Sequence, residues 1–121
     1  MDATLIEDGN LALGPFQAFW DAWSEADTEI KEKKLPHFSQ AVAIQYEEMR
    51  DHLRGADPKV SPRNIAAAKE ATDVISIALN TLRWLQFEPA EIAQIARDRA
   101  RERMLGQTHA ILEKYEKQHG C

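Results

Sequence analysis

The spacing of the apolar residues restricts this chain to helices. In almost every segment they recur every three to four residues, and no segment alternates apolar and polar residues as a strand does. Of the 121 residues, 44% are hydrophobic, which is enough for the core of one domain. The pattern therefore predicts an all-α protein, with residues 1–13 as a loose lead-in and residues 14–121 as a single domain.

Proline and glycine divide the helical pattern into four segments. Pro36 should end the first helix, because the residue before a proline avoids the α region. Gly55 should end the second, and Pro62 and Pro89 suit the first turns of the third and fourth. Gly106 should kink or split the last helix. The predicted helices cover residues 15–33, 37–53, 62–86 and 89–117. Short connections favour antiparallel neighbours, so we expect a four- to five-helix antiparallel bundle.

Charge and composition exclude several function classes. The formal net charge of −5 argues against a general nucleic-acid binder, which needs a basic surface. No segment approaches the roughly 20 apolar residues of a membrane span, and the acidic N-terminal segment does not resemble a signal peptide. Cys121 is the only cysteine, so neither an intramolecular disulfide nor a thiolate zinc site can form. We expect a cytoplasmic protein without nucleic-acid or membrane partners.

The segment KEATDVISIALN, residues 69–80, places acids on an otherwise apolar helix. At about 100° per residue, Glu70, Asp73, Ile77 and Asn80 fall on one face. The segment has few other polar positions, so this face is not readily explained as a solvated surface. Carboxylates in a cleft are costly unless something neutralises them.

A second acidic group, Glu47, Glu48 and Asp51, lies on the preceding helix. If antiparallel helices bring the two groups together, four carboxylates form a box whose repulsion requires hard cations, and Mg²⁺ suits such oxygen ligands. The box would contain Glu48, Asp51, Glu70 and Asp73. The alternative is that the acids are merely solvated, which is the commoner role of acids spaced three residues apart on a helix.

These residues resemble the signature of the MazG-like all-α nucleoside triphosphate pyrophosphohydrolases, which are related to dimeric dUTPases and phosphoribosyl-ATP pyrophosphohydrolases. The family has Glu-x-x-Glu, a spacer and Glu-x-x-Asp. Here Glu48-x-x-Asp51 and Glu70-x-x-Asp73 stand 18 residues apart, and Asn80 matches the family's amide. The similarity covers residues 37–103. Asp51 stands where the family has Glu, so direct ligation and ligation through water both stay open.

The resemblance implies hydrolysis of a nucleoside triphosphate between its α and β phosphates, with Mg²⁺ as cofactor and Mn²⁺ as a substitute. The acids of the box would hold the metals, and Glu48 would also take part in catalysis. Glu47 would orient or deprotonate the attacking water, although a surface role is equally open. Asn80 would bind the sugar or a phosphate. Family members are commonly oligomeric and differ in base, so a homodimer or homotetramer and a purine dNTP such as dGTP or dATP are compatible with the pattern.

Four further residues are candidate substrate ligands. Arg99 and Arg103 share a helix face and, by the resemblance, would hold the triphosphate, although a solvated face paired with nearby acids is the simpler interpretation. Lys69 lies beside the acidic face and is a third phosphate candidate. Gln45 could read a base edge, with a structural role as its alternative.

A competing hypothesis is a non-catalytic helical interaction module whose acids are solvated or pair with a partner's arginines. Trp20 and Trp23 are separate candidates, because tryptophan can stack on a base. Their helical spacing with neighbouring phenylalanines favours a core or an oligomer seam instead.

Overall fold

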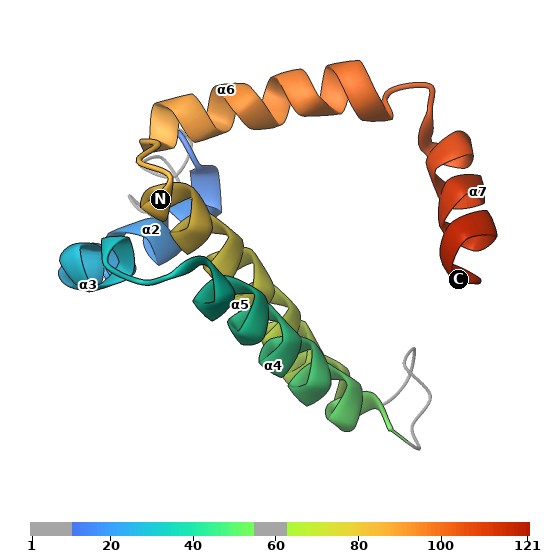
Figure 1. Cartoon of the computed structure of the whole chain (residues 1–121), viewed down its shortest axis with the longest axis horizontal. Helices are drawn as coiled ribbons and strands as arrows, with labels where there is room; N and C mark the ends of the chain where they lie inside the picture. Colours follow the sequence, from blue (N-terminus) through green and yellow to red (C-terminus); the bar gives the residue numbers. More distant parts are fainter. Residues whose placement is uncertain (1–10, 55–62) are drawn as a thin grey trace, which may run out of the picture.

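The computed structural model describes residues 11–54 and 63–121, and every regular element in these ranges is a helix (Figure 1). The 3₁₀ turns are η1 (Gly14–Phe16) and η2 (Ser24–Ala26), and η3 (Ala100–Met104) is a π-helical turn. The α-helices are α2 (Gln17–Trp23), α3 (Asp27–Lys31), α4 (Leu35–Leu53), α5 (Arg63–Trp84), α6 (Pro89–Arg99) and α7 (Thr108–His119). The all-α prediction is confirmed for the described residues.

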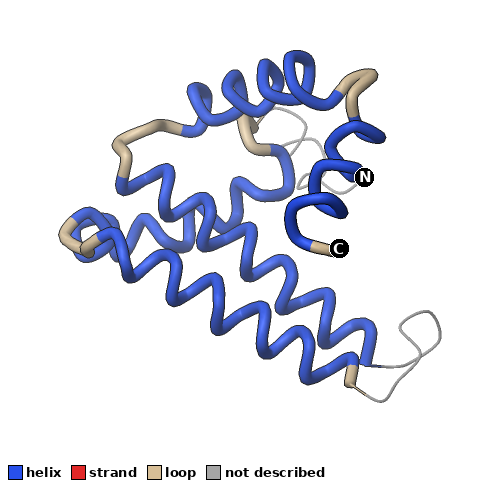
Figure 2. The backbone as a smooth tube through the Cα atoms, turned by 45° about the vertical axis from the view of Figure 1, so that its right-hand side comes forward, coloured by secondary structure: helices blue, strands red, loops and turns tan. Residues whose placement is uncertain are grey.

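The antiparallel pair of α4 and α5 forms the body of the molecule, and the two helices lie side by side in Figures 1 and 2. Helices α2 and α3 pack on α5. Trp20, Leu79 and Ile92 are buried together, so the core lies where α2 and the start of α6 meet α5. Partly buried side chains pack around this core: Leu13, Phe19, Leu82 and Phe87.

The first predicted helix is interrupted at η2. The Trp20 carbonyl accepts hydrogen bonds from Ser24 Oγ (3.0 Å) and from Arg83 Nη2 (2.5 Å). The Ser24 amide donates to Asp21 instead, which is a 3₁₀ pattern. Since Arg83 lies 63 residues from Trp20, this interruption could not be inferred from local sequence.

The same arginine holds α2 and α3 on α5. Arg83 is 4% exposed, and its guanidinium carbon lies 3.8 Å from the centroid of the Trp20 ring. It donates to Asp27 Oδ1 at 2.8 Å and to Ser24 Oγ at 3.2 Å. The Arg83 hydrogen bond, followed by that of Lys31, lowers the pKa of Asp27 below its usual 3.8.

The start of one helix differs from the sequence prediction, and the start of another agrees with it. Helix α4 begins at Leu35 rather than at residue 37, because Pro36 fits a first turn where no amide hydrogen is needed. The predicted loop and cap at residues 55–62 lie outside the described residues. Helix α6 begins at Pro89 as predicted, and Glu88 and Glu91 form a reciprocal capping box at this start.

Residues 89–119, here called the C-terminal arm, do not return along the α4–α5 pair. Gly106, at φ +77°, separates η3 from α7, which confirms the predicted split. Ile92 is buried near the root of the arm, whereas no residue of η3 or α7 is buried. In Figure 1 the arm leads away from α4 and α5. The predicted antiparallel arrangement is therefore found between α4 and α5, and the C-terminal arm leads away from this pair. No helix within the described ranges is both long and apolar enough to cross a membrane.

Candidate metal and substrate site

Glu48 of α4 and Glu70 of α5, here called the acidic pair, bring their carboxyl groups together. The Glu48 carboxyl raises the pKa of Glu70 above its usual 4.5, because a shared proton relieves the repulsion; burial and the charges of Glu48 and Asp73 act in the same direction. The Glu70 side chain is 20% exposed. Its Oε2 is buried and has no hydrogen-bond partner among the described residues. A buried oxygen without a donor is costly, so the pair is suited to a proton or a cation.

His52 of α4 also lies beside Glu70, with Nε2 3.8 Å from Glu70 Oε1. Its charge lowers the pKa of Glu70, against the effect of Glu48. Sequence reasoning did not place His52 at this site. The available signal was spacing, since His52 follows Glu48 by four residues and so shares its helix face.

Asp51 points away from the predicted box of carboxylates. Its side chain is 63% exposed, and its Oδ1 lies 3.3 Å from Arg54 Nη2, one helical turn further along. The structure therefore brings Glu48 and Glu70 into contact, keeps Asp73 near enough to affect Glu70 electrostatically, and leaves Asp51 paired at the end of α4.

All the charged candidates on these two helices except Glu70 are exposed, Glu48 and Asp73 included. Glu47 borders a shallow hollow that Met49 and Leu53 also line. It is turned by about 100° from its neighbour Glu48 around the helix axis. Lys69 is exposed on α5 beside Glu70.

The donor set bears on which kind of metal site could form. Within residues 11–54 and 63–121, no three His, Cys, Asp or Glu side chains are grouped as a metal site. Mg²⁺ commonly takes only one or two protein carboxylates when phosphate oxygens and water supply its other ligands. The acidic pair meets this minimum. It therefore fits a cation that arrives with a phosphate better than one that the chain alone encloses.

A pocket of about 270 Å³ opens between α2, α3, α4 and α5 and is here called the aromatic pocket. Its walls include the rings of Trp23, His37 and Phe38 and the amides of Gln45 and Asn80. Asn80 is 8% exposed, and Gln45 Oε1 is buried without a partner in the described part of the chain. Ligand pockets usually measure about 300–1,000 Å³, so this one suits a single ring system.

A second hollow, of about 330 Å³, adjoins the aromatic pocket and reaches Asp73, one helical turn from Glu70. It is lined by Asp73 and Ser76 and shares Trp23, Gln45 and Ile77 with the aromatic pocket. Trp23 Nε1 donates to Ser76 Oγ at 2.8 Å, which holds the indole between the two hollows. Trp23 is thus 43% exposed at a candidate site, whereas Trp20 is the core residue that the spacing favours.

Arg99 and Arg103 lie on the C-terminal arm and are exposed. Because the arm leads away from the α4–α5 pair, the structure does not bring these arginines beside the acids of the same chain (Figure 1).

Comparisons with protein-family models, with curated proteins and with solved structures find no match to this chain. The function is therefore inferred from the residues and their geometry.

Proposed function

We propose that this chain is a divalent-cation-dependent nucleoside triphosphate pyrophosphohydrolase that works as a homo-oligomer. The observation that carries the proposal is the contact between Glu48 and Glu70, whose buried Oε2 has no partner among the described residues. Two carboxylates held this close are unfavourable without a bound cation or proton. The adjoining aromatic pocket supports a substrate that combines phosphates with a heteroaromatic ring.

Different residues of the chain would bind the phosphates and the base. The acidic pair and Asp73 would receive the phosphates together with their cation, which would neutralise developing charge and lower the pKa of the attacking water. Trp23 and the amides of Gln45 and Asn80 would hold the base in the aromatic pocket. Gln45 Oε1 would accept an N–H from the base, which would remove the cost of leaving this buried oxygen unpaired.

The direct test is product analysis. Purified protein is incubated with each common NTP and dNTP plus Mg²⁺ or Mn²⁺, and the products are separated. The proposal expects a nucleoside monophosphate and pyrophosphate. Release of orthophosphate with a diphosphate, or no turnover of any nucleotide, would contradict it.

Substitutions at the proposed site and at a distant acid test whether turnover depends on the acidic residues. Glu70→Gln and Asp73→Asn should abolish turnover while circular dichroism shows unchanged helicity. Glu25→Gln makes the same chemical change at an exposed acid of η2 and should leave turnover intact.

A non-catalytic interaction module is the second candidate. The lack of a three-residue metal group in the described ranges favours it, and so do the exposed apolar side chains. Thermal melting with and without Mg²⁺ separates the two. A cation at 100 times its dissociation constant stabilises a real site by about 2.7 kcal/mol, whereas an interaction module should not respond.

A further inference from the structure

The C-terminal arm carries large apolar side chains that its own chain leaves exposed. The exposed fractions are 43% for Ile95, 47% for Met104, 70% for Leu105, 62% for Leu112 and 47% for Tyr115. Helix α7 has 12 residues, none of them buried. An isolated helix of about this length is marginal in water, so the arm needs a surface on which to pack.

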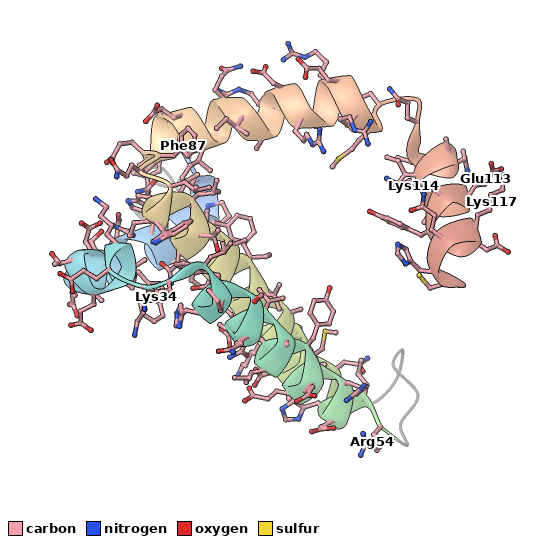
Figure 3. The ribbon with its side chains drawn as sticks, in the orientation of Figure 1. Lys34, Arg54, Phe87, Glu113, Lys114 and Lys117 are labelled. Carbon is pink, nitrogen blue, oxygen red and sulfur yellow. The ribbon has the colours of Figure 1, made fainter. Side chains whose placement is uncertain are left out.

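The arm's own chain is poorly placed to provide that surface. The root is fixed, because Ile92 packs on Trp20 and Leu79 and the capping box sets the start of α6. The 11 residues of α6 continue into the 5 of η3, and at 1.5 Å per residue they reach about 24 Å. Figure 3 shows Phe87 at the root of the arm and Lys117 at its far end. Leu105 and α7 are therefore carried away from the core.

The α4–α5 pair has an apolar surface of matching character. Shallow hollows of about 330 Å³ and about 250 Å³ are both lined by Met49 and Leu53. Ala68 and Ala71 of α5 border the hollow of about 250 Å³, and such small side chains allow another helix to approach closely. Large apolar residues of the pair are also exposed: Ile44, Tyr46, Ile65 and Ile75.

The charges of the two surfaces allow one specific pairing. Around η3 the arm is basic, with Arg97, Arg99, Arg101 and Arg103 against Asp98 and Glu102. The hollow beside Met49 is bordered by both Glu47 and Arg50, so it carries charges of both signs. Glu47 is a partner for an arginine of the arm, and the apolar side chains carry the rest of the interface.

The exposed area also fits an association between copies. The chain exposes 9155 Å², whereas a compact monomer of 13.7 kDa should expose about 6,600 Å². The excess is about 2,500 Å² over the whole chain, residues 1–10 and 55–62 included, and about a third of it would supply the roughly 800 Å² that each partner buries in a standard interface.

We infer that two copies of this chain exchange their C-terminal arms, so that each arm lies on the α4–α5 pair of the other copy. Such an exchange closes with two-fold symmetry and covers both apolar surfaces at once. One consequence rests on the proposed function: Arg99 and Arg103 of one copy approach the phosphates bound at the other copy's acidic pair. The dimer itself does not depend on that activity.

Sedimentation equilibrium of the full chain tests the interface. Leu112→Glu should raise the dimer dissociation constant about 100-fold or more, because the charge enters a two-fold interface twice. Ala110→Glu is the matched control, since it adds the same charge to α7 about 160° around the helix from Leu112. The control should stay within about threefold of wild type. Equal effects of the two variants, or a wild type that is monomeric at every concentration, would overturn the inference.

Crosslinking distinguishes exchange from an arm that folds back. A photoreactive residue replaces Leu112, and unlabelled chains are mixed with chains labelled with heavy nitrogen. Arm exchange predicts crosslinks from α7 to α4 or α5 that join one light and one heavy chain. Crosslinks confined to single chains would refute it. An intact dimer without nucleotide turnover would refute only the proposed function.

Discussion

Replacing Arg83 by methionine tests how the wall of the aromatic pocket is held. The change keeps most of the buried stem and removes the guanidinium. A hydrogen bond from a charged group to the Trp20 carbonyl contributes about 1.5–3 kcal/mol, and the contact with the Trp20 ring about 0.5–2 kcal/mol. The ion pair with Asp27, whose side chain is 38% exposed, adds less than about 1 kcal/mol.

Removing the buried charge also relieves its desolvation cost, so we expect Arg83→Met to lower the free energy of unfolding by about 3 kcal/mol. For a domain of this size the melting temperature should fall by roughly 12 °C. Urea unfolding followed by circular dichroism measures the first quantity, and a thermal scan measures the second. Because α2 carries Trp23, the fluorescence of the variant should also report a more mobile indole.

Two variants serve as comparisons. Arg97→Met makes the same change at an exposed arginine of α6 and should alter stability by less than about 0.5 kcal/mol. Asp27→Asn should cost less than about 1 kcal/mol, since only the partly exposed ion pair is weakened. If Asp27→Asn costs as much as Arg83→Met, the ion pair rather than the Trp20 contacts holds α2 and α3, and the reasoning is refuted.

Three further predictions concern single positions. The pKa of Glu70 is raised above 4.5, so the stability linked to this group is present below pH 4.5 and is lost as the pH rises through the folded pKa. We therefore compare the free energies of unfolding of Glu70→Gln and wild type by urea titration, with a chelator present to remove cations. The variant should become more stable relative to wild type as the pH rises from 4 to 7. A difference between the two proteins that does not change with pH would contradict this. Gln45→Leu removes a buried unpaired acceptor and should stabilise the free protein by about 1 kcal/mol while raising the KM for nucleotide; a loss of stability would show that the amide is already paired. Gly106→Ala should cost about 1 kcal/mol in urea unfolding, because φ is +77° and no atom lies within 4 Å of the added carbon; a neutral result would mean that this turn adopts another conformation.

The helices that were predicted well depend on local chemistry. The helix start at Pro89 and the break at Gly106 were predicted from the sequence, since both depend on residues close in the chain. The shared face of Asp73, Ile77 and Asn80 was readable for the same reason, and the structure places these residues along the two adjoining hollows.

The site itself was only partly readable. Spacing identified Glu48 and Glu70 as candidates, but it could not show that their carboxyl groups meet while Asp51 turns to Arg54. Nor could it show that Trp23 and Ser76 join the site, because their hydrogen bond spans 53 residues.

What the sequence determined by itself is the all-helical class, most helix boundaries and the acidic character of one face, because helical periodicity and capping act over a few residues. The tertiary structure alone decided the interruption at η2, the contact between Glu48 and Glu70 and the course of the C-terminal arm. Each of these depends on which side chains from distant segments share the same space, and one-dimensional spacing does not contain that information.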